Sequence, residues 1–157
     1  MVKLMRKIIS ILCLLFLITG CGSSKEDFYL SYNNKNLYLD KAFSEEAYGN
    51  YLDSFESENC AFGDKDITYI YDGIEIETYG NDKKEMIVYS IVISDENVKT
   101  NEGISLYDSV DDMIEKYGND YIKNENEYRY VHNNTEIVFI TQNNIIETIE
   151  YRLVNVD

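Results

Sequence analysis

The chain has no proline and no tryptophan, and only one histidine and three cysteines among its 157 residues. Zinc sites need several His or Cys ligands. Cys13 and Cys21 of the N-terminal segment are not expected to be available, which leaves only His132 and Cys60. There is also no P-loop, no dinucleotide-binding fingerprint and no Gly-x-Ser-x-Gly motif of a serine hydrolase. His132 lies in a predicted turn beside Asn133 and Asn134, where a solvated role is expected rather than that of a catalytic base. These absences predict a non-enzymatic protein without catalytic residues, cofactor or metal.

Long apolar runs are scarce as well, and the longest, residues 8–18, follows a basic N-terminus and ends at Thr19-Gly20-Cys21. This order is typical of a signal peptide, and the run is about half of the roughly 20 residues that span a membrane. The cysteine after small residues resembles a bacterial lipobox, in which the thiol takes a diacylglycerol before cleavage. We expect residues 1–20 to be a lipoprotein signal peptide and Cys21 to be lipidated, which anchors the protein to the cell membrane on its extracytoplasmic face. A plain secretory peptide cut near Gly20 is the alternative.

Removal of the signal peptide and lipidation of Cys21 would leave few cysteines that could react or form a disulfide. Cys13 would leave with the signal peptide and Cys21 would be acylated, so Cys60 would stand alone and no intramolecular disulfide could form. No histidine or second cysteine lies near Cys60 in the sequence. We therefore expect Cys60 to be a small buried hydrophobic residue rather than a reactive thiol.

Positive charge is scarce: the chain has 14 basic and 29 acidic residues, which gives a net charge of −15. Removing residues 1–20 takes away three basic and no acidic residues, which brings the net charge to −18. This charge argues against binding nucleic acid, whose phosphates need basic neutralisation, and against lying flat on anionic lipid. A cationic partner or divalent ions would suit it, and so would a simple requirement for solubility.

After the signal peptide, the chain divides into three parts. Residues 21–36 are polar, and we expect a lipidated cysteine followed by a flexible tether. Residues 37–100 and 101–157 are expected to form a first and a second α+β repeat. Each repeat would contain a helix and then three strands, so the predicted fold class is α+β: two tandem helix-plus-three-strand units with an antiparallel sheet and helices on one face. Because each unit is small, the halves should share an interface or one continuous sheet.

In the first repeat, Ser44 is a candidate N-cap for a helix that extends to Phe55. Three strands follow over residues 67–71, 74–79 and 86–93, with turns at Asp72-Gly73 and Gly80-Asn81-Asp82.

In the second repeat, Ser109 and Asp112 have the spacing of a capping box, and Gly118 is a candidate C-cap. Strands are expected over residues 128–130, 135–141 and 145–154. Aligning the repeats matches Tyr69 with Tyr128, Ile76 with Ile137 and Ile91 with Ile149.

Strand alternation predicts which side chains face the helices. The expected inner residues are Tyr69, Tyr71, Ile74, Ile76, Ile87, Ile91 and Ile93 in the first repeat and Tyr128, Tyr130, Ile137, Phe139, Ile145, Ile149 and Tyr151 in the second. The opposite face is mixed polar and apolar, which is typical of a docking surface. Its candidate partner-binding residues are Tyr79, Arg129, Val138, Ile140 and Arg152.

Residues 103–118, from Gly103-Ile104-Ser105-Leu106 through Asp108-Ser109 to Tyr117-Gly118, resemble a signature of small lipoproteins. These belong to the β-lactamase-inhibitor-protein-like superfamily, which includes a small lipoprotein of outer-membrane assembly. Four short stretches, residues 59–62, 69–71, 74–79 and 98–103, are similar to uncharacterised lipoproteins of Gram-positive anaerobes. Tyr107 departs from the signature, because a glycine is usual there, and the disulfides of the secreted inhibitor cannot form.

This resemblance covers residues 37–156 and implies a tandem α+β scaffold that binds proteins on its sheet face. The expected function is therefore a non-enzymatic, membrane-anchored module that docks an envelope or extracellular protein. Two alternatives stay open: a receptor for a small cell-wall ligand, which needs a pocket, and a calcium-dependent surface protein. The candidate calcium ligands are Asp64, Asp66, Asp108, Asp111 and Asp112, although their spacing does not match the twelve-residue calcium loop.

Overall fold

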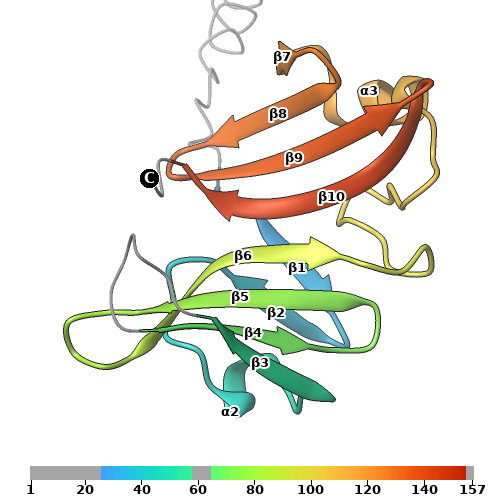
Figure 1. Ribbon diagram of the computed structural model, residues 1–157. Coiled ribbons are helices and arrows are strands. Elements are labelled where there is room, and N and C mark those ends of the chain that lie inside the picture. The colour runs from blue at the N-terminus through green and yellow to red at the C-terminus, as the bar shows by residue number, and fades with distance from the viewer. Residues whose placement is uncertain (1–25, 58–64, 155–157) are drawn as a thin grey trace, which may run out of the picture.

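The computed structural model describes residues 26–57 and 65–154, and its main element is one broad antiparallel sheet (Figure 1). Eight strands pair in the order β3-β4-β5-β6-β10-β9-β8-β7, and two more strands form a separate hairpin. The large sheet consists of β3 (Asp53–Ser57), β4 (Asp66–Ile70), β5 (Ile74–Gly80), β6 (Met86–Ile93), β7 (Ile122–Asn124), β8 (Glu127–His132), β9 (Thr135–Gln142) and β10 (Ile145–Leu153). The hairpin consists of β1 (Tyr29–Tyr32) and β2 (Lys35–Tyr38). Two helices lie in the described ranges, α2 (Glu45–Tyr48) and α3 (Val110–Tyr117).

The fold is mostly β, so the α+β expectation is met only in part. The predicted units of one helix and three strands do not form. The chain instead makes two four-stranded meanders, β3–β6 and β7–β10, which join through the antiparallel pair of β6 and β10. The two halves were expected to share an interface or one continuous sheet, and they form one continuous sheet. The pairing of β6 with β10 protects one edge strand of each meander from solvent.

The pairing register relates the two meanders residue by residue. Ile91 lies two residues after the register shift in β6, and Ile149 lies two residues after the register shift in β10. Ile91 and Ile149 are therefore equivalent, as the sequence alignment predicts. Ile76 pairs with Ile91, however, whereas the partner of Ile149 in its own meander is Phe139. The equivalent of Ile76 is therefore Phe139 and not Ile137. The predicted alignment is shifted by two residues here because the β8–β9 hairpin extends two residues further than the β4–β5 hairpin.

The predicted caps of α3 are confirmed. Ser109 Oγ accepts a hydrogen bond from the backbone N–H of Asp112 at 3.1 Å, and the Asp112 carboxylate accepts one from the backbone N–H of Ser109. Gly118 ends the helix with φ = 84°, a conformation that favours glycine. Together these caps pair backbone groups that a helix otherwise leaves unpaired at its ends.

The helix predicted after Ser44 is much shorter than expected. Ser44 caps α2 as predicted, but the helix ends after one turn at Gly49, where φ is 91°. The residues that follow form strand β3, whose pairing with β4 gives the backbone hydrogen bonds that a longer helix would have supplied. Leu52 and Phe55, which the predicted helix would have included, are 74% and 55% exposed.

The interpretation of residues 21–36 as a flexible tether is wrong for its C-terminal part. Asn33 and Asn34 have φ values of 48° and 62°, which suit the two-residue turn of a tight hairpin. Leu30 and Leu37 lie opposite each other in this hairpin and are fully buried. The folded body therefore includes β1 and β2, and the alternation of leucines with polar residues is the signal that predicts them. Cys21 and Cys60 lie outside the described residues.

One extra residue in each last strand changes which side chains face the core. Thr78 pairs with Val88 although Glu77 pairs with Ser90, so Tyr89 is a bulge residue in β6. Glu147 is the corresponding bulge residue in β10. A bulge shifts the alternation by one residue. The predictions that Ile87 and Ile145 are core residues are therefore wrong, and Val88 and Ile146, both 0% exposed, take those positions.

The core lies on one side of the large sheet. The hairpin of β1 and β2 lies behind the sheet in Figure 1, and α3 lies behind its upper part. Tyr117 of α3 packs its ring 5.1 Å from the rings of both Tyr130 and Phe139, which belong to β8 and β9. Leu30, Leu37 and Met113 are buried in the same apolar cluster. The helices and the hairpin therefore cover one face and leave the other open.

Candidate functional site: the outer face of the sheet

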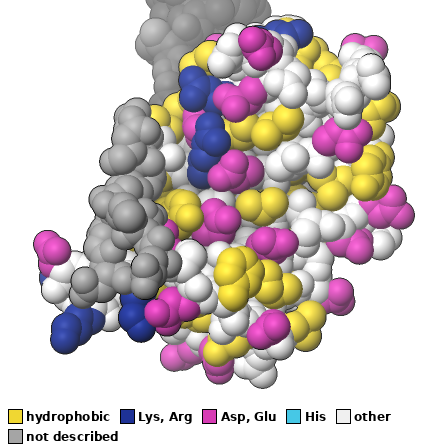
Figure 2. All heavy atoms as spheres, viewed as in Figure 1, with side chains coloured by type: hydrophobic (Ala, Val, Ile, Leu, Met, Phe, Trp, Pro, Cys, Tyr) yellow, Lys and Arg dark blue, Asp and Glu magenta, His cyan; other side chains and the backbone are white. Residues whose placement is uncertain are grey.

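The outer face is the side of the sheet opposite the core, and all five candidate residues lie on it. Strand alternation and the pairing register place there the following side chains: Ile70, Glu75, Glu77, Tyr79, Ile87, Tyr89, Ser90 and Val92 from β4 to β6, and Glu127, Arg129, Val131, Glu136, Val138, Ile140, Thr148, Glu150 and Arg152 from β8 to β10. Acidic and hydrophobic side chains alternate over this face, with few basic ones (Figure 2). No described helix or strand is layered on it (Figure 1).

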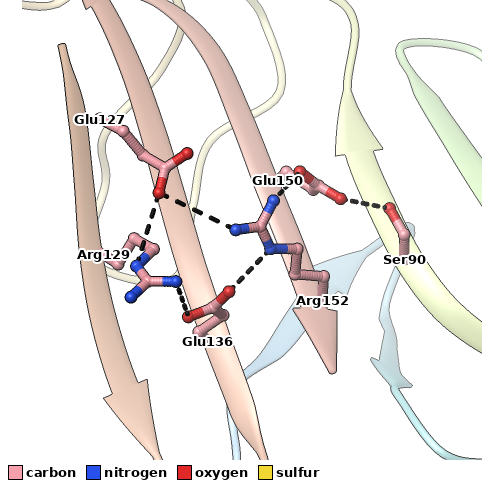
Figure 3. A network of polar contacts seen from close by, with 6 residues as sticks. All are labelled: Ser90, Glu127, Arg129, Glu136, Glu150 and Arg152. Carbon is pink, nitrogen blue, oxygen red and sulfur yellow. Dashed lines mark hydrogen bonds and ion pairs between the residues drawn. The ribbon is translucent and has the colours of Figure 1, made fainter. Parts of the chain in front are cut away.

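A network of ion pairs occupies the β8–β10 part of the outer face (Figure 3). Arg152 Nε donates to Glu136 Oε1 at 2.7 Å, and Arg152 Nη1 lies 3.4 Å from Glu150 Oε2. Arg129 lies 3.5 Å from Glu127 and 3.8 Å from the second oxygen of Glu136. Glu136 thus lies between the two arginines. The three carboxylates outnumber the guanidinium groups, so the network keeps a negative charge.

Glu136 is the most deeply buried member of this network. Only 5% of its side chain is exposed, compared with 34% for Arg129 and 31% for Arg152. A buried carboxylate is costly unless it is paired and hydrogen-bonded. The two arginines supply both kinds of contact, which fixes their side chains across β8, β9 and β10. This part of the outer face is therefore ordered before any partner arrives.

Glu150 connects the network to the first meander. Ser90 Oγ on β6 donates to Glu150 Oε1 at 3.0 Å. Burial raises the pKa of Glu150, while the charge of Arg152 and the hydrogen bond from Ser90 oppose that rise. The contact crosses the β6–β10 junction, so the polar network continues where the two meanders join.

The five predicted residues do not form one exposed patch. Val138 is 0% exposed, and its neighbours across the strands are Arg129 and Glu150, two members of the ion-pair network. Ile140 is half-buried at the β9 end of the same face. Arg129 and Arg152 are engaged by carboxylates. The sequence placed these residues on the correct face but could not show that the longer side chains cover the valine.

Tyr79 lies apart from the other four candidates, on β5 of the first meander. Its ring centroid is 6.2 Å from that of Tyr89, and both side chains are half-buried. Burial, followed by the charge of Glu77, raises the pKa of Tyr89. The two tyrosines form a second, more apolar region of the outer face. Sequence analysis missed Tyr89 because the bulge that turns it outward is not visible in the alternation.

Both outer edges of the sheet carry exposed hydrophobic side chains that sequence analysis also missed. Phe55 on β3 and Ile122 on β7 are 55% and 52% exposed. The register places both on the outer face, since Phe55 pairs with Thr68 and Ile122 pairs with Arg129. They extend the apolar component of the face to its two edges.

His132 packs against the first residues of the described chain. The ring of His132 stacks on Phe28 with centroids 4.1 Å apart, and its Nδ1 lies 3.2 Å from the carbonyl oxygen of Glu26. Among residues 26–57 and 65–154 there is no group of three or more His, Cys, Asp or Glu side chains that could hold a metal ion. No helix in those ranges is long and apolar enough to cross a membrane.

Two of the candidate calcium ligands already have local partners. The Asp108 carboxylate accepts hydrogen bonds from the backbone N–H and the hydroxyl of Ser105, and Asp112 belongs to the capping box of α3. Asp64 lies outside the described residues. Asp108 thus stabilises the loop before α3, and Asp112 stabilises the first turn of the helix.

Two shallow cavities lie away from the outer face. One, of about 220 Å³, lies between the end of α3 and the end of β8, and Glu102, Lys116 and His132 line it. The other, of about 170 Å³, is lined by Tyr32, Tyr48 and Tyr71 near the β4–β5 turn. Both are smaller than typical ligand pockets, which measure roughly 300–1,000 Å³. The outer face is therefore the larger candidate surface.

Comparison of the chain with protein-family models, curated proteins and solved structures found no match.

Proposed function

We propose that this protein is a membrane-anchored, extracytoplasmic lipoprotein that acts without catalysis and docks an envelope or extracellular protein on the outer face of its sheet. The observation that carries this proposal is the open face itself: one broad sheet has its hydrophobic core on one side, and no described element covers the other. Mixed apolar and charged surfaces of this kind mark sites of protein association. The resemblance to the β-lactamase-inhibitor-protein-like superfamily points to the same use of the sheet.

The charges of the outer face indicate the kind of partner. Arg129 and Arg152 are paired within the ion-pair network, whereas Glu75 and Glu77 have side chains on the same face without an ion pair among the described contacts. The chain as a whole has a net charge of −15. Complementary potentials steer association and suppress wrong partners. A partner with a basic surface and a few apolar side chains would complement this face.

Crosslinking in native cells tests the proposal. Photo-crosslinking residues replace Tyr79 and Ile140, one at a time, in the intact protein, and the adducts are identified by mass spectrometry. We expect one dominant protein adduct from both sites. Reversing two outer-face charges, with Glu75→Lys and Glu77→Lys, should remove the adduct. The matched control, Glu96→Lys with Glu115→Lys, makes the same charge change away from the outer face and should leave it intact.

The absence of an adduct at both sites, with the protein correctly anchored, would contradict docking by this face. The tyrosine-lined cavity near the β4–β5 turn favours one other function, a receptor for a small cell-wall ligand. Buried Tyr48 and Tyr71 form one side of that cavity, with Lys35 and Asp72 at its rim. Cell-wall fragments that raise the melting temperature of the native protein, but not of a Tyr32→Ala variant, would support the receptor function.

A further inference from the structure

The first residues of the described chain lie at one end of the sheet and are held there by hydrogen bonds and a ring contact. Asn133 Nδ2 donates to Asp27 Oδ1 at 2.9 Å, and the backbone N–H of Phe28 donates to Thr135 Oγ1 at 2.7 Å. The ring of Phe28 also stacks on His132. These contacts come from both sides of the turn between β8 and β9. Residues 26–28, where the described chain begins, are therefore held at that turn.

The connection from this point to the proposed anchor is short. Glu26 follows Cys21 by five residues, and five fully extended residues span at most about 18 Å. The tether of residues 21–36 predicted from composition would have reached roughly three times as far. Because β1 and β2 belong to the folded body, a lipid on Cys21 would hold the β8–β9 turn within about 18 Å of the membrane surface.

The pairing register shows which parts of the sheet share that end. Thr135 pairs with Leu153, and Arg152 pairs with Ser90 in the middle of β6, whose first residues continue beyond this pair toward the same end. The β5–β6 turn therefore lies at the same end as the β8–β9 turn, and Figure 1 shows both at the left of the sheet. The β9–β10 turn lies at the opposite end. The eight residues of β9 separate the two ends by about 27 Å.

We propose that the end of the sheet carrying the β8–β9 turn faces the membrane and that the strands stand upright from it. The proposal rests on the proposed lipid anchor at Cys21. The net charge of −15 opposes laying a broad face on anionic lipid, so the short connection and the charge favour the same end-on orientation. The outer face is then presented sideways, toward other proteins of the same membrane.

Fluorescence quenching at the two ends of β9 tests this orientation. Asn134→Cys and Gln142→Cys place a label at exposed positions on the membrane-facing and distal ends, each in a Cys60→Ser background. The acylated protein is reconstituted in vesicles of phosphatidylcholine and phosphatidylglycerol that contain a lipid with a spin-labelled headgroup. Because such quenching is short-ranged and the ends are about 27 Å apart, we expect at least about threefold stronger quenching at residue 134.

The control lengthens the connection. A Gly/Ser insertion between Lys25 and Glu26, several times the native length, should reduce the quenching at residue 134 and bring the two labels close to equality. Equal quenching in the acylated protein without the insertion, or stronger quenching at residue 142, would overturn the orientation alone. If mass spectrometry finds no acyl group at the N-terminus, the lipid anchor is wrong and the orientation is wrong with it. Docking by the outer face does not depend on this result, because crosslinking tests it separately.

Discussion

The two meanders of the large sheet have the same strand pairing but are secured by different means. The β7–β10 meander has an eight-residue helix with a complete capping box and a buried ion-pair network. The β3–β6 meander has a helix of four residues and an ion pair, Lys65 with Glu56, in which both side chains are at least half exposed. Two meanders with the same strand pairing therefore differ in the helix and the ion pairs that stabilise each of them. The comparison indicates that the β3–β6 meander depends on its junction with β10 for much of its stability.

The largest effect is expected at equivalent core positions on either side of that junction. Ile76 and Phe139 are both 0% exposed, so truncation to alanine leaves a cavity and should lower the free energy of unfolding by about 3–4 kcal/mol at each site. If the sheet unfolds as one unit, urea denaturation followed by circular dichroism and by tyrosine fluorescence will show one coincident transition in each variant. Two separate transitions in either variant would show that the meanders unfold independently.

The second largest effect should come from breaking the ion pairs, and it should differ between the two meanders. Arg152→Met leaves buried Glu136 with Arg129 as its remaining cation and should lower the free energy of unfolding by about 2 kcal/mol. Lys65→Met breaks an exposed pair and should cost less than about 1 kcal/mol. Urea denaturation of the two variants measures both losses. Equal losses would mean that the network on the second meander gives no special stability.

The N-caps of the two helices should also differ in how much they stabilise the protein, with the larger contribution again in the β7–β10 meander. Ser109→Ala removes one half of the capping box and should cost about 1 kcal/mol. Ser44→Ala removes a single hydrogen bond, 3.2 Å long, at a helix of one turn, and we expect less than half of that loss. Thermal unfolding of both variants checks the difference. A larger loss for Ser44→Ala would contradict the assignment of the stronger local support to α3.

Tyr107 has a backbone conformation that favours glycine. Its φ is 69°, and its side chain is 58% exposed. A bulky residue in the left-handed region is strained, so Tyr107→Gly should raise the free energy of unfolding by up to about 1 kcal/mol. Tyr107→Ala keeps a Cβ and should show little of this gain. A gain of the same size in both variants would mean that the tyrosine side chain, and not the backbone strain, is unfavourable.

The smallest effect is pH-dependent and concerns the junction of the meanders. Burial raises the pKa of Glu150 above its ordinary value of 4.5, so the folded state binds this proton more tightly than the unfolded state. The stabilisation is complete below pH 4.5 and is lost as the pH rises through the folded-state pKa. Glu150→Gln should therefore raise the melting temperature at neutral pH, and the difference should shrink in acid. A difference that grows on acidification would contradict this sign.

The sequence predicted the features that depend on local residue patterns. The capping box of Ser109 and Asp112, the stop at Gly118 and the turns after β4, β5 and β8 all follow from short motifs. The alternation of inner and outer side chains was also correct over most of β5, β8 and β9. These features need no knowledge of the rest of the chain, because a few neighbouring residues determine them.

The features that depend on distant partners could not be predicted in this way. The bulges at Tyr89 and Glu147 appear only when the opposite strand is known, and they turned two core predictions, Ile87 and Ile145, into errors. Edge strand β3 forms because β4 is available to pair with it. At the candidate site, the alternation placed Val138 on the outer face, but its burial depends on side chains from three strands. Long-range pairing therefore decides the details of the docking surface.

The most direct test of the proposed docking surface compares its exposure in two settings. Hydroxyl-radical footprinting, read by mass spectrometry, would measure modification of Tyr79, Tyr89 and Ile140 in the isolated protein and in native membranes. Tyr38, which is 42% exposed on the hairpin behind the sheet, is the internal control. We predict that the three outer-face residues react in the isolated protein and are protected in membranes, while Tyr38 reacts in both. Equal modification of the outer face in both settings would contradict its role as a docking surface.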